Sequence, residues 1–342
     1  MKRTSLFSLL CLGLLPPASA VELVVYNWPF YLDPEVKTRF TQETGHTIKE
    51  LYFDSEEARS NLLLAKHAPL VDLTVIDYQS LQTLSWSTLF NDKPAAGYKS
   101  EAAIEPRFLA ACGQQASPYF WGSIGIAYRS SHVGQPITHW QQLFELDAKN
   151  SDLAGHIIMV DDAFDLVSVA LKALNYSINT RNKDELKQAF THLQAQKHAV
   201  LNYRLSLAAI RDPKQEAEVY AAMVYSGDFY TLQKISKYQD WVFVSPEEGS
   251  PIWIDCLAIN KKSSHPKEAV ELINFLQRPD IANLNGEKSG FAPTLKEALI
   301  SATMKADPVA YPPSSHISHS ESYSPELVHD ELRNAIFFSV IK

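Results

Sequence analysis

Short apolar runs alternate with amphipathic stretches along most of this chain, and this alternation restricts the fold more than any other feature. The runs lie at residues 23–27, 72–76, 125–129, 156–160, 221–225, 241–244 and 256–260. Each has the length and the β-branched or aromatic content of a strand. Because helical patterns separate them, the sequence predicts an α/β fold with mostly parallel sheets flanked by helices.

Helix start signals follow several of these runs. Asp33-Pro34-Glu35 combines a capping residue with a proline in the first turn. Residues 182–185, Asn-Lys-Asp-Glu, form a capping box. A further helix is expected to begin at His265-Pro266 and to end at Arg278-Pro279. Residues 311–320, rich in Pro, Ser and His, are expected to be a loop that leads to the last helix.

The first twenty residues predict a secretory signal peptide. Lys2 and Arg3 precede an apolar run from Leu6 to Leu15, and Ala18-Ser19-Ala20 has the small residues of a cleavage site. The mature chain is expected to begin at Val21. Since no later stretch is apolar over the length of a membrane span, we expect an exported, soluble protein.

The length and charge of the mature chain narrow the classes of protein further. The mature chain, residues 21–342, is too long for a single hydrophobic core of ordinary size, which predicts two lobes. The formal net charge is −8, and the loss of Lys2 and Arg3 makes it more negative. An acidic surface argues against nucleic acid as a partner and is compatible with a cationic ligand. In an oxidising compartment Cys112 and Cys256 can pair, but the sequence leaves their pairing open.

Catalytic signatures are missing from the sequence. It contains no G-x-S-x-G elbow, phosphate-binding loop, dinucleotide fingerprint or H-E-x-x-H motif. His316 and His319 have a spacing that metal ligands can have, but a solvated polar loop is the favoured interpretation. We therefore expect no catalysed reaction, no cofactor and no metal.

Acidic and aromatic residues recur where predicted strands begin or end. The acids are Asp77, Asp161, Asp162, Asp165, Asp228 and Asp255, and the aromatic residues are Trp28, Tyr31, Tyr225, Trp253 and Phe291. Ligands bind at the carboxyl ends of strands in such sheets. A carboxylate pairs with an ammonium group, and a ring face adds a cation–π contribution of roughly 0.5–2 kcal/mol. The combination predicts a site for an organic amine, although about half of these acids, Asp161 among them, are expected only to cap helices.

Several blocks of this sequence resemble the periplasmic spermidine/putrescine-binding proteins, the polyamine branch of the type II solute-binding proteins. The blocks are YNWPFY (26–31), TGHTI (44–48), DLTVID (72–77), PYFWGSIGIAYR (118–129), the segment 160–180 and the long block 245–282. The resemblance covers nearly the whole mature chain in order. It implies a two-lobed fold with the ligand in the cleft between the lobes, here residues 21–128 with 254–300 and residues 129–253 with 301–342.

The resemblance also assigns roles to individual residues. The family's ring walls match Trp28, Tyr31, Trp253 and Phe291, and Tyr225 stands where the family usually has Trp. The family's amine-binding acids match Asp162, Asp165 and Asp255, and Asp228 matches an acid of the putrescine branch. The family's acid in the first loop is replaced here by Phe30. We expect Asp77, which stands where the family has Ser, to supply the missing carboxylate.

The sequence thus predicts a monomeric periplasmic polyamine-binding protein for ligands of the spermidine, norspermidine and putrescine class. Its partner is expected to be an inner-membrane ABC permease that takes up the polyamine. The alternative is a polyamine sensor of the norspermidine type, which signals through a membrane-bound GGDEF/EAL protein to control cyclic-di-GMP and biofilm. An exported hydrolase on the same lobes is the third and least favoured interpretation.

Overall fold

The computed structural model describes residues 20–342 apart from 54, 83–87, 95–97, 147–149 and 328–329. The strands are β1 (Glu22–Asn27), β2 (Thr47–Tyr52), β3 (Leu73–Asp77), β4 (Ala116–Arg129), β5 (Ile157–Met159), β6 (Val200–Tyr203), β7 (Ala221–Tyr225), β8 (Trp241–Val244), β9 (Pro251–Ile259), β10 (Ala292–Pro293) and β11 (Glu321–Ser322). The predicted signal peptide lies, except for Ala20, outside the described residues.

The α-helices surround these strands. They are α1 (Pro34–Thr44), α2 (Glu56–Leu64), α4 (Pro106–Cys112), α5 (Gln141–Phe144), α6 (Ala163–Ala173), α7 (Lys183–Gln196), α8 (Ser206–Ile210), α9 (Pro213–Glu216), α10 (Asp228–Ile235), α11 (Pro266–Leu276), α12 (Pro279–Ser289), α13 (Ala302–Lys305), α14 (Ser314–Ile317) and α15 (Glu331–Ile341). No helix in the described part of the chain is both long and apolar enough to span a membrane.

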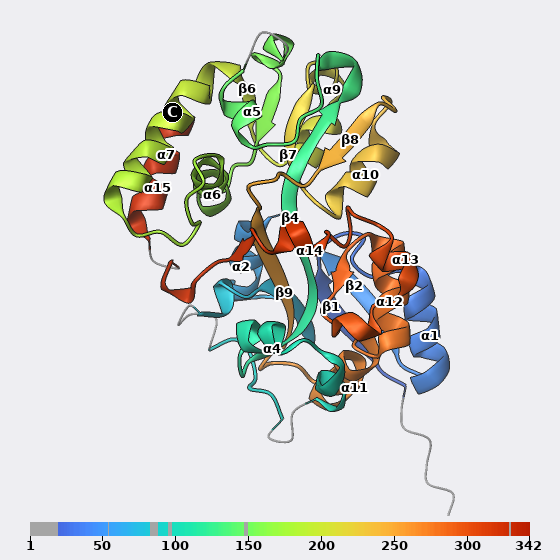
Figure 1. Cartoon of the computed structure of the whole chain (residues 1–342). Helices are drawn as coiled ribbons and strands as arrows, with labels where there is room; N and C mark the ends of the chain where they lie inside the picture. Colours follow the sequence, from blue (N-terminus) through green and yellow to red (C-terminus); the bar gives the residue numbers. More distant parts are fainter. Residues whose placement is uncertain (1–19, 54, 83–87, 95–97, 147–149, 328–329) are drawn as a thin grey trace, which may run out of the picture.

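The strands form two lobes that share the long central strand β4 (Figure 1). Its first part, Ala116 to Ser123, lies antiparallel to β9 in the lower lobe of the figure. Its second part, Ile124 to Arg129, lies antiparallel to β7 and β8 in the upper lobe. The predicted two-lobed α/β fold is therefore confirmed, with one strand continuous through both lobes.

The seven apolar runs of the sequence each overlap a strand, but four of the described strands are missing from the prediction: β2, β6 and the two-residue strands β10 and β11. The strand order is β2-β1-β3-β9-β4-β7-β5-β6, so the missed strands β2 and β6 are the two edges. Edge strands are partly exposed and carry mixed residues, as TIKELY and VLNY do, so no continuous apolar run marks them. The outer strands β1, β2 and β3 pair in parallel as expected, whereas β4 and β9 run antiparallel to their main neighbours.

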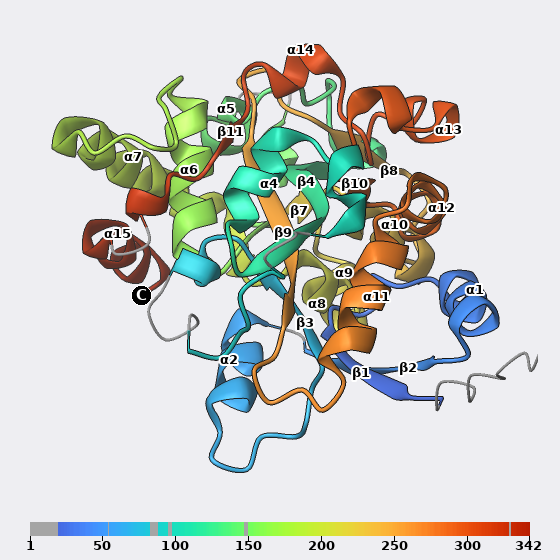
Figure 2. The ribbon, with the colours of Figure 1, turned by 90° about the horizontal axis from the view of Figure 1, so that it is seen from below.

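Each lobe has its own buried core. One cluster contains residues of β1, β3, β9, α1, α11 and α12, and another contains residues of β5, β7, α6, α7 and α15. Viewed from below, α11 and α12 lie beside α1 in the first lobe (Figure 2). Met304, Ala310 and Tyr323 also belong to the first cluster. The chain after residue 301 thus runs along the first lobe before α15 packs against α6 and α7. The exact lobe bounds expected from the sequence stay a prediction.

The predicted helix starts are present at the residues that signal them. The side chain of Asp33 accepts a hydrogen bond from the Glu35 N–H, and Pro34 begins α1. Asn182 caps α7 in the same way, and α11 begins at Pro266. The loop expected at 311–320 is partly wrong, because residues 314–317 form the short helix α14. A proline at position 313 immediately before that turn is compatible with a helix start.

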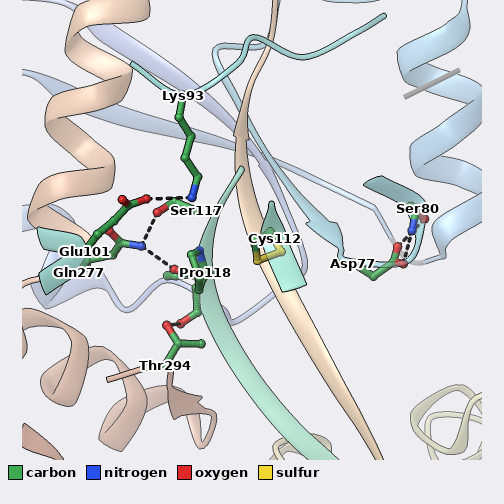
Figure 3. The surroundings of a disulfide bond; sticks show 11 residues. Asp77, Ser80, Lys93, Glu101, Cys112, Ser117, Pro118, Gln277 and Thr294 are labelled. Atoms are coloured by element: carbon green, nitrogen blue, oxygen red, sulfur yellow. Dashed lines mark hydrogen bonds and ion pairs between the residues drawn. A yellow bond between two sulfur atoms is a disulfide. The ribbon is translucent and has the colours of Figure 1, made fainter. Parts of the chain in front are cut away.

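A disulfide joins Cys112 at the end of α4 to Cys256 in β9, with 5.9 Å between their Cα atoms (Figure 3). The sequence left this pairing open, because the register that brings β9 beside β4 is a tertiary feature. Cys256 directly follows Asp255, so the disulfide anchors the strand that carries one of the predicted site residues. Gln277 supports the same strand pair through hydrogen bonds to Ser117 Oγ and the Pro118 carbonyl at 2.6 and 2.7 Å.

Replacing both cysteines by alanine is expected to lower the free energy of unfolding by about 2–5 kcal/mol, because the unfolded chain loses a long closed loop. Urea unfolding of the mature protein would measure it. Refolding in reductant should lower the stability of the wild type to that of the variant and leave the variant unchanged. An equal response of both proteins to reductant would contradict the disulfide.

Candidate functional site

Tyr31 and Asp255 form the first part of the site. Tyr31 lies in the loop between β1 and α1, just before the helix cap Asp33. Its hydroxyl donates a hydrogen bond to Asp255 Oδ2 at 2.8 Å, and both side chains are buried. The Phe291 ring packs on Tyr31 with 4.4 Å between centroids. The first loop, the middle of β9 and the chain after α12 therefore meet at one place.

Asp165 is the centre of the second part. Tyr225 at the end of β7 donates a hydrogen bond to Asp165 Oδ2 at 2.6 Å, and Tyr323 donates one to Oδ1 at 2.5 Å. The preceding acid, Asp162, accepts the N–H groups of Phe164 and Asp165 at 2.9 Å and so caps α6. Since Tyr323 packs with the first lobe and α6 with the second, this carboxylate links the two lobes.

Asp77 ends β3 directly beside Asp255, its partner in the antiparallel register of β3 and β9. It accepts hydrogen bonds from the Ser80 N–H and Oγ at 2.8 and 2.6 Å (Figure 3) and from Arg59 Nη2 at 2.9 Å. Burial opposes ionisation of Asp77, but Arg59 and Ser80 outweigh it and hold the pKa of this carboxyl below its usual range. Asp77 is thus an ionised carboxylate that already has a cationic partner.

The other acids are destabilised in their charged forms. Desolvation raises the pKa of Asp255 to about 7, and the nearby Asp77 carboxylate adds to the shift. Desolvation and the neighbouring Asp165 carboxylate raise the pKa of Asp162 to about 7. Desolvation also raises the pKa of Asp228 to about 7, and that of Asp165 above its usual range. A bound cation favours the ionised form of every one of these groups.

Aromatic rings lie close to several of these acids. Trp253, on β9, packs against the cores of both lobes, and its ring centroid lies 5.8 Å from that of Phe291. Its indole N–H is buried and has no hydrogen-bond acceptor among the described residues. Trp28 packs its ring on Phe53 with 4.4 Å between centroids. Rings and carboxylates from two lobes are the surroundings that an organic cation needs.

A close approach between the lobes depends on Gly227, the residue before α10. A Cβ atom at this position would lie 1.9 Å from Cε1 of Phe291. Only a residue without a side chain lets this part of the second lobe contact the ring of the first. Across the same boundary, the Asp228 carboxylate contributes to the raised pKa of Tyr31 after burial and Asp255, so Asp228 lies near the first-lobe part of the site.

The structure brings most of the predicted site residues together. Contacts or strand register join Tyr31, Trp253, Asp255 and Phe291 with Asp77, and a hydrogen bond joins Asp165 to Tyr225. Asp162 and Asp228 lie at the starts of α6 and α10, and Trp28 contacts Phe53. That these side chains contact a ligand stays a prediction, as does the replacement of the acid missing at Phe30 by Asp77.

Sequence reasoning missed Glu56, Arg59 and Tyr323. Glu56 and Arg59 follow the edge strand β2, which the sequence did not reveal, so an acid after its carboxyl end went unnoticed. Recognising the alternation in TIKELY as a strand would have found them. Tyr323 has no local signal, because only the path of the last crossing segment brings it to Asp165.

The cap expected at Asp161 is wrong. Asp161 is exposed, and the neighbouring Asp162 caps α6, because its backbone is extended and its side chain accepts the N–H groups of Phe164 and Asp165. His316 and His319 lie near the backbone carbonyls of Pro246 and Glu247, with Nδ1–oxygen distances of 3.0 and 3.2 Å. Among the described residues, no group of three His, Cys, Asp or Glu side chains is arranged to hold a metal ion.

A family model described as bacterial extracellular solute-binding protein matches residues 35–312. The chain belongs to this family. Members are binding proteins that act outside the cytoplasm, in agreement with two lobes that share a site.

Individual relatives narrow the comparison. The chain is 36% identical to a norspermidine sensor of Vibrio cholerae over 79% of its length and 74% of the relative. It is 29% identical to a spermidine/putrescine-binding periplasmic protein of Salmonella typhimurium over 87% of its length and 85% of the relative. The structure superimposes on the substrate-binding protein of a spermidine/putrescine ABC transporter from Streptococcus pneumoniae with a TM-score of 0.77 at 24% identity, covering 94% of this chain and 100% of the other.

The raised pKa of Asp255 makes stability depend on pH. The pKa of this carboxyl is about 4 in the unfolded chain and about 7 in the folded protein. Its contribution to stability is therefore fully present below about pH 4 and is lost as the pH rises through about 7. Asp255→Asn, which does not titrate, should therefore raise the free energy of unfolding by about 1–3 kcal/mol at pH 8 and change it little at pH 4.

Urea unfolding without ligand at both pH values would measure this effect. The exposed Asp161→Asn is the matched control and should leave the stability unchanged at both. A loss of stability in Asp255→Asn at pH 8 would contradict a destabilising charge at this position.

Proposed function

We propose that the protein binds a linear polyamine between its lobes. Rings of Trp28, Tyr31, Tyr225, Trp253 and Phe291 surround the methylene chain, and the carboxylates of Asp162, Asp165, Asp228 and Asp255 take the ammonium groups. The observation that carries the proposal is the set of desolvated acids from both lobes with pKa values raised to about 7. Ammonium groups are the partners that reverse this cost, and the rings add cation–π attraction.

The relatives support the same ligand class. Their names specify norspermidine in one case and spermidine or putrescine in others. The relatives are binding or sensing proteins, so the function is capture of the ligand without turnover. We propose that ligand binding stabilises the closed arrangement of a monomer in the periplasm.

An inner-membrane protein then recognises the closed, ligand-bound form. We propose an ABC permease as the partner and uptake as the function; several relatives are spermidine/putrescine-binding periplasmic proteins. A sensor that controls a membrane-bound GGDEF/EAL protein is the second candidate, because the relative at 36% identity is a norspermidine sensor. Both candidates use the same ligand site.

Polyamines are expected to stabilise the protein by about 2.7 kcal/mol at a concentration 100 times Kd. A thermal-shift panel with spermidine, norspermidine and putrescine would show it, with glutamate and glycine as ligands expected to cause no shift. In calorimetry, Asp255→Asn should weaken polyamine binding at least tenfold, since a desolvated charge pair is lost. The control Asp161→Asn should bind like the wild type. No shift with any polyamine would refute the proposed ligand class.

Deletion of the gene in its own host distinguishes between the two candidate partners. If the protein serves uptake, the deletion strain should lose import of labelled polyamine. The wild-type gene should restore import, and the Asp255→Asn gene should not. Sensing instead requires a change in cyclic-di-GMP and biofilm that responds to added polyamine while import stays normal. Import that is unaffected by the deletion would exclude the uptake function.

A further inference from the structure

The site contains a built-in cation, Arg59 on α2. Its side chain is 1% exposed, and its Nη2 lies 2.9 Å from Asp77 Oδ2 and 3.1 Å from Ser80 Oγ. Its Cζ lies 5.5 Å from the centroid of the Phe53 ring, on which Trp28 also packs. A guanidinium is therefore held between a carboxylate and an aromatic ring, as a bound alkylammonium group would be.

Arg59 is also placed within the group of acids proposed to bind the ligand. Asp77, its partner, is paired with Asp255 in the β3–β9 register. Glu56 precedes Arg59 by one helical turn, and the protein around it and the Asp77 carboxylate raise its pKa well above the usual range. Although burial opposes it, Glu56, Asp77 and Asp255 together raise the pKa of Arg59, which keeps the guanidinium charged.

The pair has a direct consequence for charge balance. Asp77 contributes a negative charge to the site, and Arg59 cancels it within hydrogen-bond distance. Without Arg59, Asp77 would be one more desolvated carboxylate open to a ligand ammonium, next to Asp255. With Arg59 in place, that position is already filled by a positive charge of the protein itself, which repels a further ligand charge.

We propose that Arg59 is a specificity-determining residue whose guanidinium, paired with Asp77 beside Phe53, takes the place of one ligand ammonium group and selects against polyamines with an additional positive charge. This inference rests on the proposed polyamine-binding function. The ligand property that Arg59 controls is the number of ammonium groups, as between the diamine putrescine and the triamine spermidine, which is putrescine extended by an aminopropyl group.

Two single substitutions should change this selectivity in opposite directions. Arg59→Met keeps an apolar stem and removes the charge, so Asp77 becomes available, and the ratio of the spermidine Kd to the putrescine Kd should fall at least tenfold. Asp77→Asn removes the carboxylate that offsets the Arg59 charge next to Asp255, so the ratio should rise at least tenfold. Isothermal calorimetry of the mature protein with both ligands gives the ratio directly.

Two further variants separate charge from structural damage. Arg59→Lys keeps the positive charge and should keep the wild-type ratio. The double variant Arg59→Met/Asp77→Asn removes both charges and should return the ratio to that of the wild type, because the net charge is unchanged. Should Arg59→Met fail to fold, the comparison of Asp77→Asn with the double variant decides the question alone.

The failures of the two proposals are distinguishable. If the variants bind polyamines with an unchanged spermidine-to-putrescine ratio, or if both single variants shift it in the same direction, Arg59 and Asp77 form only a structural ion pair and this inference is overturned. If the wild type binds neither ligand, the proposed function fails instead.

Discussion

The pairing of β4 with β9 is the constraint on which the rest of the structure depends. β4 passes from one lobe to the other within a single buried strand and changes its neighbours between Ser123 and Ile124. β9 lies beside β4 and carries Trp253 and Asp255. Cys256, the residue after Asp255, forms the disulfide with Cys112 and so anchors β9. Because both lobes are built on these strands, a rotation of one lobe against the other moves the site without dismantling either core.

The acids between the lobes are held against their own electrostatic preference. Burial raises the pKa values of Asp162, Asp228 and Asp255 to about 7, whereas Arg59 and Ser80 hold that of Asp77 below its usual range. The rest of the fold, with a separate core in each lobe, compensates for this cost. Such local conflict is typical of functional sites, where stability is lost in exchange for ligand affinity. The proposed ligand cation would remove this conflict, because it favours the ionised form of each acid.

Contacts across the lobe boundary show how closure can depend on a few side chains. Phe291 lies against Gly227, where no side chain could be accommodated, and the Tyr323 hydroxyl reaches Asp165 on the opposite lobe. Asp165, which is proposed to meet the ligand, therefore also joins the lobes through Tyr323. The proposed ligand contacts and the observed lobe contacts thus use common residues.

The sequence alone determined the α/β class, the seven central strands, the starts of α1, α7 and α11 and most of the acids and rings, because apolar runs, caps and strand-end acids are local patterns. The edge strands β2 and β6 left no such pattern, since exposed edges need no continuous apolar run. Only the tertiary structure paired Cys112 with Cys256, made Asp162 rather than Asp161 the cap, and placed Arg59 on Asp77 and Tyr323 on Asp165. These contacts join residues that the sequence separates, and their geometry follows from strand register and lobe packing, which no local pattern encodes.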